Sequence, residues 1–88
     1  MRIIRDRIMN ADPGRVATAA MAVLDTLQDR DVNEQIQATA CLFVLFCRRY
    51  GLQGPELLTA AGRLMEDADA LRPEFRAALR YMSEEWTA

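Results

Sequence analysis

The sequence predicts an all-α domain, a compact bundle of four main helices plus a short N-terminal helix. Apolar residues recur at intervals of three and four in four long segments, which is the spacing of one helix face. Capping residues, glycine and proline separate these segments at the positions where helices begin and end. A chain of 88 residues, of which 51% are apolar, has enough material for one hydrophobic core. We therefore expect residues 1–88 to form a single helical domain.

The first two elements are separated by a break at residues 10–14. Residues 2–9 are predicted to form a short helix with isoleucines on one side. This helix would serve as an arm or a lid. Asp12 is suited to cap the next helix and Pro13 to occupy its first position, where the missing N–H has no cost. The apolar side chains of this second helix follow the helical repeat and favour close packing against the helix at residues 32–50; they are Val16, Ala20, Val23, Leu24 and Leu27.

The third element, residues 32–50, is the longest predicted helix and carries the longest apolar run. Asp31 caps it, with Glu34 three residues later in a capping-box-like pattern, and Gly51 follows its end. Every side chain in residues 40–47 is apolar. A helix that is apolar on all sides needs cover on every side. We therefore expect this helix to be buried at the centre of the domain, and any face left open to be closed by a second copy in a homodimer or by another protein.

Two further helices are expected after this one. The first begins at Pro55 and should lie antiparallel to residues 32–50. Its apolar stripe comprises Leu57, Leu58, Ala61, Leu64, Met65 and Ala68. The last helix follows Pro73, because proline disfavours the helical conformation for the residue before it. Its bulky apolar face comprises Phe75, Leu79, Met82 and Trp86, and its opposite side presents Arg72, Arg76 and Arg80 at four-residue spacing.

Composition argues against catalysis, metal binding and nucleic-acid recognition. The chain has no histidine, and its two cysteines, Cys41 and Cys47, lack the spacing of zinc ligands. The net charge is −2, and the helix from Pro55 carries a single base, Arg63, whereas a DNA-reading surface is strongly basic. No apolar run reaches the about 20 residues of a membrane span, and the N-terminus lacks the apolar stretch of a secretory signal. We therefore expect a cytoplasmic, non-enzymatic protein that needs no metal or cofactor.

One set of side chains near the C-terminus is a candidate for binding a protein partner. Arginine offers a planar fork of donors that suits carboxylates, and Trp, Tyr and Arg dominate binding hot spots. The structural alternative is a solvated row of arginines, with the tryptophan completing the core. The candidate residues are Arg72, Arg76, Arg80, Tyr81 and Trp86.

A second set, at the end of residues 32–50, suggests a different function. Arg48, Arg49 and Tyr50 would hold a small anionic molecule, such as a signalling nucleotide, between the subunits of an oligomer. The structural alternative is that positive charge at a helix C-terminus complements the helix dipole without any ligand. A rise in melting temperature with ligand would support the binding hypothesis.

The basic residues also suggest a class of protein. All 11 of them are arginine. With its short length, its predicted helices and its lack of a catalytic motif, the chain resembles the small helical accessory proteins of phages and prophages, which include anti-defence and anti-CRISPR-like inhibitors. The resemblance covers the whole chain in size and composition and assigns no individual residue. It implies a protein that docks on a host or phage protein and blocks or holds it.

Overall fold

The computed structural model describes the backbone of residues 2–86 and the side chains of residues 6–86. This part of the chain contains five helices and one small β-hairpin. The helices are α1 (Arg2–Met9), α2 (Pro13–Leu27), α3 (Val32–Tyr50), α4 (Gly54–Met65) and α5 (Pro73–Glu85), and the strands are β1 (Glu66–Asp67) and β2 (Ala70–Leu71). The predicted all-α class, with four main helices and a short N-terminal helix, is confirmed.

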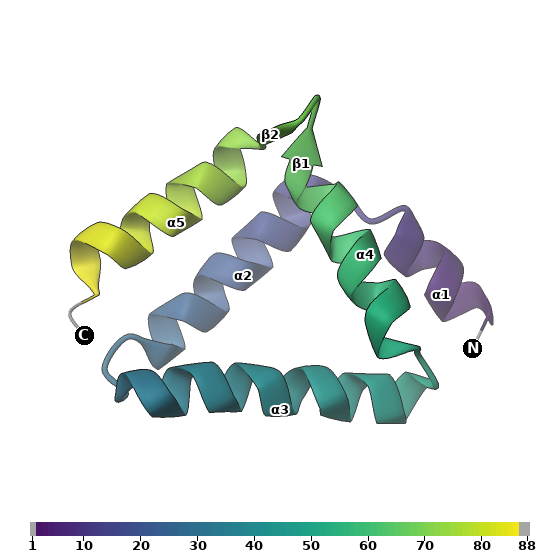
Figure 1. Ribbon diagram of the computed structural model, residues 1–88, viewed down its shortest axis with the longest axis horizontal. Coiled ribbons are helices and arrows are strands. Elements are labelled where there is room, and N and C mark those ends of the chain that lie inside the picture. The colour runs from purple at the N-terminus through teal and green to yellow at the C-terminus, as the bar shows by residue number, and fades with distance from the viewer. Residues whose placement is uncertain (1, 87–88) are drawn as a thin grey trace.

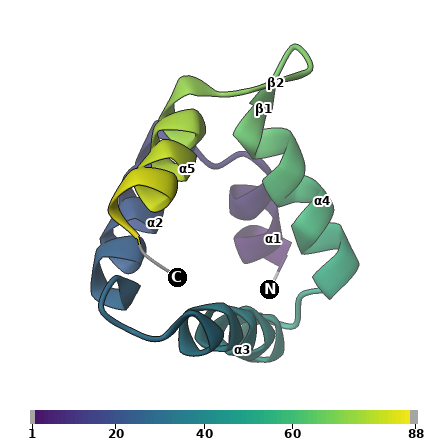
Figure 2. The same ribbon diagram turned by 60° about the vertical axis from the view of Figure 1, so that its left-hand side comes forward.

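Three of the helices form the sides of a triangle. α3 is its base, and α2 and α4 rise from the two ends of α3 (Figure 1). α5 runs beside α2 in the same direction, and α1 lies beside α4, as Figures 1 and 2 both show. The helices therefore make two neighbouring pairs, while α3 joins the rest of the molecule near its two ends.

The helix boundaries follow from local capping chemistry. The Asp12 carboxylate accepts a hydrogen bond from the backbone N–H of Arg15 at 2.9 Å, and the Asp31 carboxylate accepts one from that of Asn33 at 3.1 Å. At the end of α3, Gly51 has a left-handed φ of 64°, and the N–H of Leu52 donates to the Cys47 carbonyl at 2.9 Å. A left-handed glycine that ends a helix in this way was predicted from the sequence.

A tight hairpin between α4 and α5 was not predicted. β1 and β2 pair antiparallel, with Glu66 opposite Leu71 and Asp67 opposite Ala70. The two turn residues, Ala68 and Asp69, have φ values of 48° and 67°. Positive φ at both central positions is typical of the type I′ turn, which matches the twist of the flanking strands. The hairpin ends α4 at Met65, before the last residue of the predicted stripe, and returns the chain toward α2.

The most deeply buried apolar residues lie between α2 and α5. Among the described residues, the buried apolar side chains are Ala17 on α2 and Phe75 and Ala78 on α5. Alanine lets two helices approach closely, and the Phe75 ring fills the space between them. The hydroxyl of Tyr81 on α5 donates to Asp25 Oδ1 on α2 at 2.7 Å and also contacts the side-chain oxygen of Gln28. Because the helices are parallel, these polar contacts lie at the end of the pair away from Phe75.

The prediction that residues 32–50 are buried at the centre is wrong, although the bounds of the helix are correct. The one buried residue on α3 is Gln35, whose side-chain Nε2 donates to the Leu27 carbonyl at 2.9 Å. The predicted antiparallel packing of α3 and α4 is also absent, because the two helices diverge from their connecting turn (Figure 1). The physical reason is that α5 uses its apolar face on α2, and α4 lies beside α1. No helix of the described chain is left to cover the middle of α3.

Candidate functional site

The exposed hydrophobic surface is the most unusual property of this molecule. Six large apolar side chains on α3 are exposed, and Leu45 and Phe46 retain 60% and 55% of their accessible area. The others on this helix are Val32, Ile36, Leu42 and Val44. Monomeric proteins rarely leave so much apolar surface on one element, and such patches usually mark a site of interaction.

The total surface area supports the same conclusion. The chain exposes 6999 Å², whereas a folded monomer of its mass, 10.0 kDa, exposes about 5,200 Å². Its radius of gyration is 13.8 Å, against about 12 Å for a compact domain of this length. The chain therefore exposes about 1,800 Å² more than a folded monomer of its mass. This extra area is about twice the area that one partner buries in a standard protein–protein interface.

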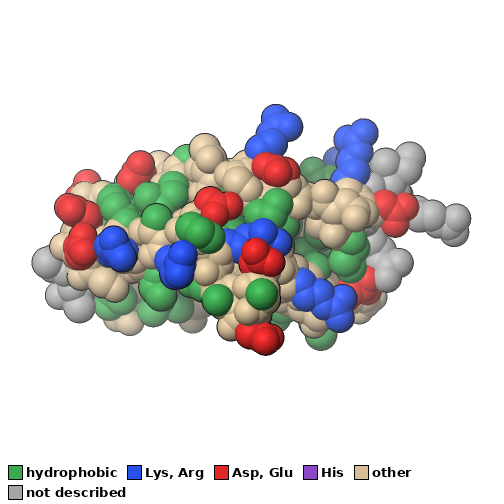
Figure 3. Space-filling view, turned by 90° about the horizontal axis from the view of Figure 1, so that it is seen from above, with side chains coloured by type: hydrophobic (Ala, Val, Ile, Leu, Met, Phe, Trp, Pro, Cys, Tyr) green, Lys and Arg blue, Asp and Glu red, His purple; other side chains and the backbone are tan. Residues whose placement is uncertain are grey.

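The outward side of α5 is a second exposed surface. Leu79 retains 58% of its accessible area, and Arg76 and Arg80 are exposed on either side of it in the sequence. The side chains of these two arginines form no ion pair with the described residues. Seen from above, this side of the molecule shows basic side chains standing among hydrophobic and acidic ones (Figure 3). We call Arg76, Leu79 and Arg80 the α5 outer face.

The other three residues of the predicted partner-binding set are half-buried in the fold. Arg72 is half-buried, and its Nε donates to the Leu64 carbonyl at 2.8 Å. Tyr81 faces α2 through its contact with Asp25. Trp86 follows the end of α5, half-buried, with its indole N–H buried and without a hydrogen-bond partner among the described residues. The five predicted residues therefore do not form one surface, because only Arg76 and Arg80 are exposed.

The Asp25–Tyr81 contact has a consequence at high pH. The pKa of Tyr81 is raised above its ordinary value of 10.0, first because its hydroxyl donates to the Asp25 carboxylate and second because the side chain is desolvated. A group whose pKa is raised by folding stabilises the fold in its protonated form, and that contribution is lost as the pH rises through the raised pKa. The contact therefore contributes fully to the stability of the α2–α5 pair below pH 10, and this contribution is lost as the pH rises through the raised pKa of Tyr81.

This effect can be measured by ultraviolet titration. In a Tyr50→Phe variant Tyr81 is the one remaining tyrosine, so its ionisation can be followed at the phenolate absorbance band. We expect a midpoint above 10.0, and a lower midpoint when Asp25→Asn is added, because a neutral amide no longer disfavours the phenolate. A midpoint that Asp25→Asn leaves unchanged would contradict the contact.

The second predicted set lies at the end of α3. The Arg49 guanidinium carbon is 5.1 Å from the centre of the Tyr50 ring, and that ring stacks on Phe46 with centroids 6.4 Å apart. A pocket of about 410 Å³ at this end of α3 is lined by Arg48, but Arg49 and Tyr50 are not among its lining residues. The structure therefore does not bring Arg48, Arg49 and Tyr50 together around one cavity.

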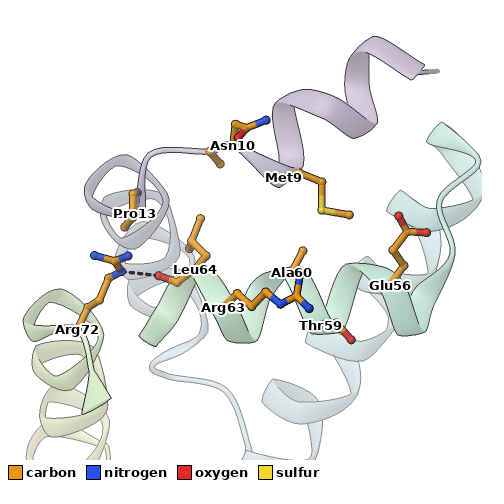
Figure 4. A pocket seen from close by; sticks show the side chains of 10 residues that line it. Met9, Asn10, Pro13, Glu56, Thr59, Ala60, Arg63, Leu64 and Arg72 are labelled. Carbon is orange, nitrogen blue, oxygen red and sulfur yellow. Dashed lines mark hydrogen bonds between the residues drawn. The ribbon is translucent and has the colours of Figure 1, made fainter. Parts of the chain in front are cut away.

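A larger pocket, which the sequence did not predict, lies between α4 and the junction of α1 with α2. Its volume is about 710 Å³, and Figure 4 shows Met9 directed across it toward α4. Its lining includes Glu56, Arg63 and Arg72, so it carries charges of both signs. The pocket depends on a contact between residues distant in sequence, which no local pattern reveals.

The described residues contain little that indicates other kinds of site. Among them, no three His, Cys, Asp or Glu side chains gather as a metal site would require. None of the described helices is long and apolar enough to cross a membrane. No model of a known protein family, no curated protein and no solved structure matches this chain.

Proposed function

We propose that this protein is a small non-enzymatic protein-binding module. In the cytoplasm it acts as an adaptor or inhibitor of phage or prophage origin that docks on a host or phage protein and blocks or holds it. The observation that carries the proposal is the exposed apolar surface of α3 and α5, which includes Leu45 and Leu79. Apolar area of this extent gains most free energy when another protein covers it.

The α5 outer face indicates the chemistry of that protein. Arg76 and Arg80 are one helical turn apart, so their side chains lie on the same side of α5, and Leu79 is exposed next to them. A guanidinium gives bidentate hydrogen bonds to a carboxylate, and a leucine gains from an apolar contact. The matching partner presents two acidic side chains around a small apolar patch.

The proposal predicts that Arg76→Ala/Arg80→Ala weakens partner binding by about 10- to 100-fold, as expected for hot-spot arginines. The wild-type protein is first used to capture and identify its partner from a lysate of its host. The affinity of the purified pair is then measured for both proteins by calorimetry. The melting temperature should not change, because neither side chain forms an ion pair with the described residues.

A matched control separates a specific contact from an effect of net charge. Arg7→Ala/Arg15→Ala removes the same charge from exposed positions on α1 and α2. This variant should bind the partner as the wild type does. Equal weakening by both double variants would indicate nonspecific electrostatic attraction, and unchanged affinity in both would remove the α5 outer face from the site.

A further inference from the structure

One side of α3 has the features of a helix–helix interface. A helix places on one side the residues that follow Glu34 by four, seven, eight, eleven and fifteen positions. We call them the α3 docking face: Glu34, Ala38, Cys41, Leu42, Leu45 and Arg49. Phe43 and Cys47, which line the pocket next to the start of α4, point about 180° away. The α3 docking face is therefore directed away from the α3–α4 turn.

The middle of this face is apolar and open to solvent. Leu45 retains 60% and Leu42 retains 44% of their accessible area, and Cys41 is exposed. Each end carries an exposed charge, a base at Arg49 and an acid at Glu34, whose carboxylate also forms a solvent-exposed ion pair with Arg30 of its own chain at 3.6 Å. An apolar centre bordered by charges is the usual composition of a helix–helix seam between two chains.

We propose that two copies of this chain associate through the α3 docking face, with the two α3 helices antiparallel. In this orientation Glu34 of one copy lies opposite Arg49 of the other, and Leu45 lies opposite Ala38. A parallel orientation would place Glu34 against its own counterpart and Arg49 against its own, which is repulsive. Antiparallel α3 helices also oppose their dipoles favourably.

The surface area fits a second copy as the occupant. A stable homodimer buries about 2,000 to 5,000 Å² in total. The excess of about 1,800 Å² belongs to the whole chain, so an interface in that size range has the α3 docking face at its centre and extends onto neighbouring exposed surface. A 19-residue helix such as α3 is about 28 Å long, long enough to form the centre of such an interface. The inference rests on the proposed protein-binding role and names one partner, while it leaves the α5 outer face for another protein.

The first test is the solution mass by light scattering over a concentration series. We expect twice the monomer mass of 10.0 kDa at low micromolar concentration. Leu45→Glu should raise the dissociation constant at least 100-fold, because it buries a carboxylate opposite Ala38 on each side of the apolar seam. The control is Ile36→Glu, which introduces the same charge at a position 65% exposed on another side of α3. This variant should remain a dimer.

A second test does not depend on a destabilising substitution. In the antiparallel pair the two Cys41 side chains lie beside the two-fold axis, whereas Cys47 is on the opposite side of α3 and nearer its end. A short bismaleimide should therefore cross-link Cys47→Ser into a dimer and leave Cys41→Ser uncross-linked. Cross-linking of Cys41→Ser but not of Cys47→Ser would overturn the assignment of the face.

Charge exchange tests the orientation. Glu34→Arg and Arg49→Glu should each weaken the dimer, and the double variant should restore it, because the antiparallel pairs are then re-formed with reversed signs. No restoration would overturn the antiparallel pairing. A wild-type protein that is a monomer at every concentration would overturn the dimer, yet binding of a partner through Arg76 and Arg80 would still support the proposed function.

Discussion

Phe75→Ala is expected to lower the free energy of unfolding by about 3 to 5 kcal/mol, the usual cost of removing a buried phenylalanine ring. Phe75 retains 7% of its accessible area and lies between α2 and α5, where the other buried apolar residues, Ala17 and Ala78, are small. The neighbours therefore offer little side-chain volume to fill the cavity. A domain of this length has about 4 to 13 kcal/mol of net stability, so the variant loses a large part of it. Urea unfolding followed by circular dichroism measures the loss.

Leu79→Ala is the matched control for this prediction. It lies one turn from Phe75 on the same helix, but it retains 58% of its accessible area. Its removal should change the free energy of unfolding by less than about 1 kcal/mol, because little area is returned to water. Both variants must be compared at the same protein concentration, since any self-association adds to the apparent stability. Equal losses in the two variants would contradict a core located between α2 and α5.

The helix boundaries could be predicted because they depend on residues close in the sequence. Asp12 and Asp31 cap α2 and α3 by bonding to N–H groups two or three positions later, and Gly51 supplies the left-handed residue that ends α3. The hairpin between α4 and α5 was missed because its turn residues, Ala68 and Asp69, do not include the glycine that usually accompanies positive φ.

Burial could not be predicted in the same way, because it depends on which helices become neighbours. The apolar run in α3 predicted burial at the centre of the domain, but the sequence did not show that α5 would pack on α2 and leave α3 exposed. The same difficulty applies to the candidate site. Arg72 looked equivalent to Arg76 and Arg80 because all three are spaced by four residues, yet its acceptor is the Leu64 carbonyl on α4. Only the tertiary structure separates a structural arginine from two exposed ones.

This distinction leads to an expected result for Arg72→Ala: the free energy of unfolding should fall by about 1 to 2 kcal/mol, as for the loss of a partly exposed hydrogen bond from a charged donor. The Arg72 Nε bond to Leu64 and the backbone bond from Arg72 to the Met65 carbonyl, each 2.8 Å long, hold the start of α5 to the end of α4. Urea unfolding measures the loss.

Two further substitutions show whether the arginine row acts as one unit. Arg72→Lys keeps the charge but lacks the Nε donor of the guanidinium, so it should recover only a small part of the lost stability. Arg76→Ala should leave stability unchanged, because its side chain forms no ion pair with the described residues. If Arg72→Ala instead reduced partner binding alone, with no loss of stability, all three arginines would belong to the binding surface. Loss of stability at Arg72 together with loss of binding at Arg76 and Arg80 would divide the row between a structural contact and a docking face.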